Sequence, residues 1–174
     1  MKPLVFNSTP LIYLTKAGLT KVIEDLINEK MTSSIVKKEI VDEGKRKGVP
    51  DAIALENLFE KGVIKVSSPK DKTFVSRLME TRGLHIADAE VLALAQERMG
   101  TAVIDDGVAR KTAKVYGIDY VGTPYVLMRA TYERLISKDE AKSAIKEMIT
   151  LGWRCSIESY VKIMEALESI RLNP

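Results

Sequence analysis

Two adjacent acids, Asp105 and Asp106, follow a short apolar run and precede Gly107. Neighbouring carboxylates repel each other, and burial at the end of a strand raises that cost, so a bound divalent cation is one way to stabilise them. An ordinary turn is the other interpretation, because Asp-Gly is a common turn sequence. Taken alone, the pair favours neither interpretation.

Three further polar side chains lie at expected element ends. Asn7 directly follows the apolar run 4–6, Glu39 lies on a predicted helix, and Asp88 falls in the first turn of the most apolar predicted helix. Glu39 by itself is typical of a solvated boundary carboxylate, and Asp88 of a helix-capping acid stabilised by the helix dipole. Glu90 is two residues from Asp88, so the two side chains diverge and we expect only Asp88 to point into a shared site.

The chemistry that this set predicts is binding of a hard cation. Carboxylate and amide oxygens suit Mg²⁺ or Mn²⁺, whereas the single Cys155 and the single His85 argue against zinc and against a cysteine–histidine nucleophile. The sequence has no Walker-type phosphate loop, no G-x-G-x-x-G fingerprint and no G-x-S-x-G elbow.

The elements that must position these residues alternate along the chain. We expect strands at 4–6, 31–33, 63–66, 101–104 and 120–121, and helices at 11–18, 19–29, 34–44, 51–62, 73–81, 87–99 and 108–116, with further helices after Gly122 that break near Ser137 and Gly152. Such alternation predicts an α/β fold with a parallel sheet covered on both faces. Ligands bind at the carboxyl ends of the strands in such sheets, where Asn7 and the acid pair fall.

The composition is that of one ordinary globular domain. The chain has 174 residues, of which 45% are hydrophobic and 29% charged, and its 27 basic and 24 acidic residues give a net charge of +3. That charge permits a nucleic-acid partner without requiring one. No apolar run approaches the ~20 residues of a membrane span, and Asn7 and Pro10 interrupt any signal peptide, so we expect a cytoplasmic protein with no membrane partner.

Four ordered segments carry a resemblance to a known family. They are Leu4-Val5-Phe6-Asn7-Ser8-Thr9-Pro10-Leu11-Ile12, Ile35-Val36-Lys37-Lys38-Glu39, the run from Ala87 to Ala95, and the run from Val103 to Arg110. In this order and spacing they resemble the PIN-domain superfamily, most closely the prokaryotic branch of VapC-like toxins. The resemblance covers roughly residues 3–130.

The resemblance implies a three-layer α/β/α sandwich with a central parallel sheet, here with a C-terminal helical extension over about 131–174 in a single domain. It also implies a ribonuclease that hydrolyses single-stranded RNA with Mg²⁺ or Mn²⁺. The family's acids match Glu39, Asp88 and Asp106, with Asp105 as an additional acid. The family's first acid falls at Asn7, which departs from the pattern but retains an amide oxygen for a metal or water.

Substrate and partners follow from the same resemblance. Ser8 is a polar neighbour of the expected site, and Arg110 and Lys111, directly after the acids, could hold the RNA backbone. The basic run 45–47 could do the same, although a solvated loop is its simpler interpretation. PIN toxins are commonly homodimers that a small antitoxin protein neutralises.

Two alternatives stay open. Asn7 favours a catalytically weak or inactive PIN-like module that binds RNA or a protein. A flavodoxin-like phospho-receiver requires acids at the end of the first strand, where this chain has Asn7. Metal dependence of RNA cleavage separates the enzyme from the first alternative.

Overall fold

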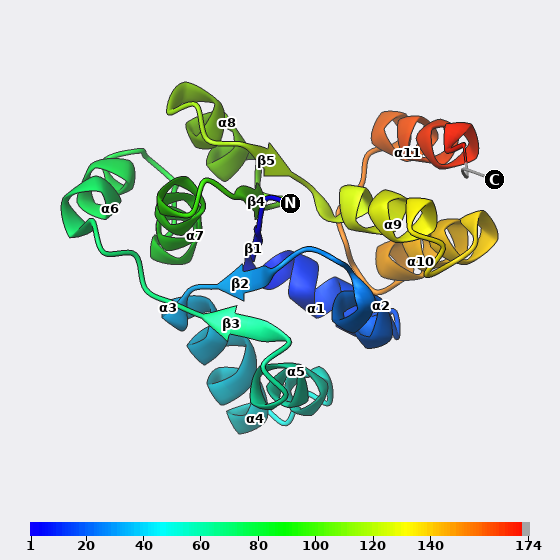
Figure 1. Cartoon of the computed structure of the whole chain (residues 1–174), viewed down its shortest axis with the longest axis horizontal. Helices are drawn as coiled ribbons and strands as arrows, with labels where there is room; N and C mark the ends of the chain where they lie inside the picture. Colours follow the sequence, from blue (N-terminus) through cyan, green and yellow to red (C-terminus); the bar gives the residue numbers. More distant parts are fainter. Residues whose placement is uncertain (172–174) are drawn as a thin grey trace.

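The chain folds into three layers around a parallel sheet (Figure 1). The structure, a computed structural model, describes residues 1–171. The strands lie in the spatial order β3-β2-β1-β4-β5, and every neighbouring pair is parallel. They are β1 (Leu4–Phe6), β2 (Lys30–Thr32), β3 (Ile64–Val66), β4 (Thr101–Val103) and β5 (Tyr120–Val121). The predicted α/β sandwich is confirmed.

Helices connect the strands and extend beyond the last one. They are α1 (Ser8–Lys16), α2 (Thr20–Asp25), α3 (Ser34–Lys37), the π-helix η1 (Lys38–Glu43), α4 (Gly44–Arg46), α5 (Asp51–Glu60), α6 (Lys72–Met79), α7 (Ile86–Glu97), α8 (Gly107–Val115), α9 (Thr123–Tyr132), α10 (Lys138–Thr150) and α11 (Ile157–Ser169). Figure 1 shows α6 and α7 on one side of the sheet and α1, α9 and α10 on the other. The C-terminal extension therefore thickens the layer that α1 begins.

The centre of the fold is the contact of α7 with β1 and β4. Every residue of β1 is buried, as expected for a parallel strand covered on both faces. All residues from Asp88 to Ala95 are buried as well, because α7 also packs against α6 and α8. This explains why α7 is apolar nearly all round, and why its two acids, Asp88 and Glu90, require specific partners.

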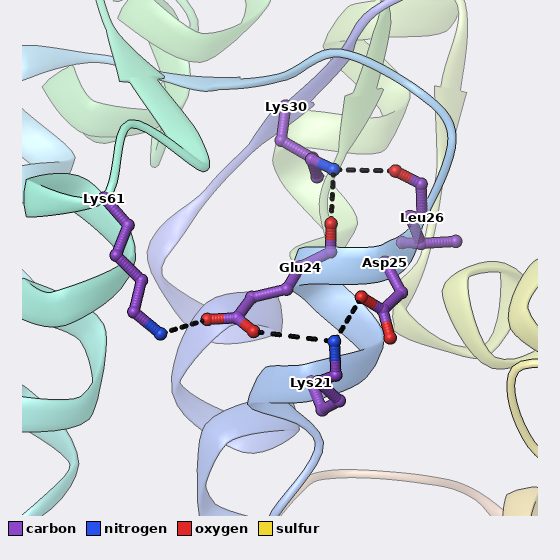
Figure 2. Close-up of polar contacts among 6 residues, drawn as sticks. All are labelled: Lys21, Glu24, Asp25, Leu26, Lys30 and Lys61. Carbon is purple, nitrogen blue, oxygen red and sulfur yellow. Dashed lines mark hydrogen bonds and ion pairs between the residues drawn. The ribbon is translucent and has the colours of Figure 1, made fainter.

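The helix expected over 19–29 is wrong, because α2 already ends at Asp25. Lys30, a buried residue of β2, donates from Nζ to the carbonyl oxygens of Glu24 at 3.1 Å and Leu26 at 2.7 Å (Figure 2). The last carbonyls of a helix lack intrahelical partners, and a lysine charge there is favourable. Burial lowers the pKa of Lys30, against the charges of Asp25 and Glu133 that raise it.

The division into a core over about 3–130 and C-terminal helices over about 131–174 stays a prediction, and residues 172–174 of that range lie outside the described residues. One cluster of buried apolar side chains extends from Leu4 in β1 to Leu167 in α11. None of the helices within residues 1–171 has the length and apolar character needed to cross a bilayer.

Candidate active site

The candidate site lies where β1 and β4 end side by side. Phe6 is the register partner of Val103, and the amide of Asn7 donates to the carbonyl oxygen of Val103 at 3.0 Å. Asn7 then begins α1, and the loop after β4 carries Asp105 and Asp106. Parallel pairing of β1 with β4 therefore places Asn7 and the loop with Asp105 and Asp106 at the same edge of the sheet.

Asn7 is buried and serves both helices that meet at this edge. It is the N-cap of α1, and its Oδ1 accepts from the amide of Ser8 at 2.8 Å. Its Nδ2 donates to Oδ1 of Asp88 at 2.5 Å. Because the oxygen is held by the Ser8 amide, the Asn7 side chain presents a hydrogen-bond donor, not a ligand oxygen, to the buried acid.

Asp88 combines a capping contact with the contact to Asn7. Its Oδ2 accepts from the amide of His85 at 3.2 Å, at the first turn of α7. Burial raises the pKa of the Asp88 carboxyl, the hydrogen bonds from His85 and Asn7 lower it, and the nearby charge of Asp106 raises it further. Glu90, two residues along, lies instead beside Lys72 of α6, with Oε1 3.5 Å from its Nζ.

Glu39 contacts Ser8, the neighbour of Asn7, from a π-helical segment. The helix that begins at Ser34 widens to π geometry over Lys38–Glu43, a feature often found at functional sites. The exposed carboxylate of Glu39 accepts from Oγ of Ser8 at 2.6 Å. A hydrogen-bonded series therefore runs from Glu39 through Ser8 and Asn7 to Asp88.

Asp106 is exposed and caps α8, accepting from the amide of Ala109 at 2.8 Å through Oδ1. Its Oδ2 has no hydrogen-bond partner among residues 1–171. Its charge acts on Asp88, so the two acids share one electrostatic environment. Asp106 is therefore a helix-capping residue and can at the same time remain a candidate metal ligand.

Asp105 is used differently from its neighbour. Its Oδ1 accepts from the amide of Thr123 at 2.9 Å and from Nη2 of Arg110 at 3.3 Å, and its Oδ2 accepts from Oγ1 of Thr123 at 2.6 Å and Nε1 of Trp153 at 2.9 Å. Nε of Arg110 donates to the carbonyl oxygen of Ile104 at 2.8 Å. These contacts tie the loop after β4 to α9 and to the segment after α10.

Sequence reasoning did not identify Thr123 or Trp153 as partners of Asp105. Trp153 is the only tryptophan of the chain, and it is buried. A buried indole N–H requires an acceptor, so this residue type was the available signal. Lys111, predicted to contact RNA, is exposed on α8.

The donor chemistry of the site fits a small hard cation. Across the described range 1–171, no three Asp, Glu, His or Cys side chains form a group that could hold a metal ion by themselves. Mg²⁺ requires less, because it keeps several waters and is usually bound through one or two carboxylates together with substrate phosphates. Asp88 and Asp106 supply two carboxylates, and Asn7 holds Asp88 in place.

A hollow of about 460 Å³ lies beside Glu39. Lys38, Glu39 and Glu43 form one wall, and the N-terminal turn of α7 at His85 and Ile86 forms the other. The exposed carboxylate of Glu39 thus borders a space large enough for a polar ligand.

Comparison with known families is consistent with this geometry. Among curated proteins, none matches the chain. A family model described as a PIN domain matches residues 3–169, which is nearly the whole sequence and includes every residue of the candidate site. The chain therefore belongs to the PIN domain family.

Proposed function

We propose that this chain is a Mg²⁺- or Mn²⁺-dependent endoribonuclease that hydrolyses phosphodiesters of single-stranded RNA. PIN domains are in general nucleases, which makes hydrolysis of a nucleic acid the starting point. The observation that carries the proposal is the hydrogen-bonded series Glu39–Ser8–Asn7–Asp88 at the carboxyl end of β1, next to the loop after β4 that carries exposed Asp106. Two acids that act on each other at one strand edge are a place for a divalent cation.

In the proposed mechanism, Asp88 and Asp106 hold the cation. When bound, the ion lowers the pKa of water and offsets charge on the phosphoryl oxygens. Asn7 fixes Asp88 Oδ1 through its 2.5 Å hydrogen bond, and the His85 amide fixes Oδ2. Glu39, exposed in the adjoining hollow, accepts the proton of the attacking water at its carboxylate, while Ser8 orients that carboxylate. As the water oxygen bonds to phosphorus, the P–O bond to the leaving ribose oxygen breaks, and that oxygen takes a proton from solvent.

The test is cleavage of a labelled single-stranded RNA with Mn²⁺ or with EDTA. We expect Asp106→Asn and Asp88→Asn to abolish metal-dependent cleavage. Asp71→Asn is the matched control, because Asp71 also caps a helix and accepts from an amide, that of Phe74, at 2.8 Å. Asparagine is as good an N-cap as aspartate, so neither Asp106→Asn nor Asp71→Asn should disturb the helix. Cleavage that continues in EDTA would refute the mechanism.

A second candidate function is a PIN-like module that binds RNA or a protein without cutting. The observation that favours it is the amide of Asn7, which satisfies Asp88 where a cation otherwise would. RNA binding in EDTA together with no cleavage at any Mn²⁺ concentration would support this module and exclude the enzyme.

We also propose that the chain acts as a toxin, forming a homodimer that a small antitoxin protein binds. Exposed apolar side chains on α11 support an interface: Ile157 is 85% exposed and Val161, four residues later on the same helix face, is 47% exposed. Light scattering gives the molar mass in solution and so shows whether the chain is a dimer. Val161→Glu should shift the equilibrium towards the monomer. A monomer at all concentrations would contradict this part of the proposal, and growth unaffected by expression of the chain would contradict the toxin role.

A further inference from the structure

A second hollow, of about 380 Å³, lies on the α1 side of Asp106. Three segments that are far apart in the sequence form it: Thr9 and Tyr13 of α1, the loop 105–107 after β4, and residues 152–154 after α10. Its volume falls within the range of small-ligand sites. Asp106, a candidate metal ligand, therefore also lines this hollow.

The wall formed by Trp153 is fixed in place from two directions. Gly152 has φ +101° and ends α10 with two reversed hydrogen bonds, from its own amide to Ile149 O at 3.0 Å and from the Trp153 amide to Met148 O at 2.8 Å. The turned chain directs the Trp153 indole at Asp105, which accepts its N–H at 2.9 Å. Asp105 is therefore a positioning residue for this hollow.

The groups that remain available in the hollow suit a nucleotide. Tyr13 is half-buried and gives an aromatic ring, with Lys16 Nζ 5.6 Å from the ring centroid. Arg154 is exposed and gives a cation that matches a phosphate. Thr9 adds a hydroxyl. An aromatic ring beside basic side chains is the arrangement with which proteins bind single-stranded nucleic acids.

We propose that this hollow binds the nucleotide adjacent to the cleaved phosphodiester, with its base on Tyr13 and its phosphate on Arg154. The proposal rests on the proposed function, because it concerns the same RNA. Trp153, only 7% exposed, is a wall and not a stacking surface. The base contact is made by a ring face, so the subsite tolerates different bases.

Binding of RNA is measured by fluorescence anisotropy in EDTA, where cleavage cannot occur, with a fluorescein-labelled single-stranded decamer of uridine. Tyr13→Ala should weaken binding about tenfold, the typical effect of losing one stacked base, and Tyr13→Phe should bind like wild type. Arg154→Ala should weaken binding and reduce the salt dependence by about 0.7 in the log–log slope, the value for one phosphate contact to a single strand.

Matched controls exist for both positions. Tyr132 is an exposed tyrosine on α9 with Arg129 5.6 Å from its ring, so Tyr132→Ala removes a similar aromatic–cation pair away from the hollow. Arg98 follows α7 at the end opposite Asp88, and Arg98→Ala removes an equal charge. Both controls should retain wild-type affinity. Equal losses in the controls and in the subsite variants would overturn the proposal.

A photochemical measurement decides the matter even if Tyr13→Ala fails to fold. A decamer with 4-thiouridine should crosslink, in the wild-type chain, to a peptide that contains Tyr13 or residues 152–154, and crosslinks found only elsewhere would refute the subsite. Wild-type binding with unchanged affinity in both subsite variants refutes the subsite and leaves the nuclease standing. No wild-type binding to RNA at all removes the proposed substrate, and the subsite with it.

Discussion

Asn7→Asp puts the charge of a carboxylate where the structure has an amide donor. The exchanged group lies 2.5 Å from Asp88 Oδ1, and both residues are buried. A hydrogen bond to a charged group contributes about 1.5–3 kcal/mol. Two like charges about 4 Å apart, at an effective dielectric constant of about 20, repel by about 4 kcal/mol. The substitution therefore opposes folding in the absence of a cation.

Protonation of one of the two carboxyl groups limits the loss of folding stability. Keeping one carboxyl neutral at pH 7, about three units above its ordinary pKa, costs about 4 kcal/mol, so the pair can share a proton at a similar cost. We expect a destabilisation of about 4 kcal/mol in EDTA at pH 7, which is about 10 °C in Tm for a chain of this size. A carboxyl pair with a raised pKa in the folded state retains its stability below about pH 4 and loses it as the pH rises through the raised value.

A divalent cation should reverse the effect. The new carboxylate at position 7 would add a negative charge beside Asp88 and Asp106, so Mn²⁺ should stabilise the variant more than wild type. If the added charge favours the metal-bound transition state by about 1.4 kcal/mol, cleavage becomes about tenfold faster. The assays are thermal unfolding in EDTA and in Mn²⁺, and cleavage rate against Mn²⁺ concentration. Asn57→Asp, an exposed change on α5, is the control for added charge.

This reasoning is refuted if Asn7→Asp and wild type have equal unfolding temperatures in EDTA. If Asn7→Asp and wild type unfold at the same temperature in EDTA, the contact between positions 7 and 88 does not exist in solution. If the two forms also have the same Mn²⁺ midpoint for cleavage, position 7 does not take part in metal binding. A variant that is destabilised in EDTA and remains so in Mn²⁺ would mean that no ion binds between these acids.

Three further changes test buried polar contacts elsewhere in the fold. Lys30→Met should destabilise by about 1–3 kcal/mol because it leaves the carbonyls of Glu24 and Leu26 unsatisfied, as measured by urea unfolding. The wild-type advantage should grow as pH rises toward 10.5, because the unfolded chain binds the Lys30 proton more tightly than the folded chain. Asp105→Asn should cost about 1–3 kcal/mol and change Trp153 fluorescence, since an amide cannot accept all the donors that the carboxylate accepts; unchanged emission would contradict this. Glu90→Gln should leave stability unchanged or raise it, because Oε2 of this buried acid has no hydrogen-bond partner among the described residues 1–171; a loss above about 2 kcal/mol in urea unfolding would contradict this.

Local patterns were sufficient to predict the sheet and its carboxyl edge. Short apolar runs such as Leu4–Phe6 alternate with helical segments, and the rule that parallel strands present ligands at their carboxyl ends depends on topology alone. Asn7 and Asp106 lie at that edge because each directly follows or closely follows a strand. Their position required no knowledge of distant contacts.

Other features could not be predicted from apolar spacing, because polar contacts and local helix geometry define them. The end of α2 depends on Lys30, which reaches back from the next strand to its last carbonyls. The helix predicted over 34–44 widens instead to π geometry over Lys38–Glu43. The spacing of apolar residues in the sequence indicates neither the Lys30 hydrogen bonds nor the π geometry.

The acid pair shows most clearly where sequence reasoning ends. Asp105 and Asp106 are chemically identical and adjacent, so the sequence offers both as candidate metal ligands and does not distinguish between them. In the structure, Asp106 caps the first turn of α8 through Oδ1, and its Oδ2 has no partner within residues 1–171, whereas Asp105 accepts from donors 18 and 48 residues away in the chain. Thr123 begins α9, and Trp153 lies in the segment between α10 and α11. These donors stabilise the charge of Asp105 within the protein, whereas the carboxylate of Asp106 is exposed and is the one we propose as a metal ligand.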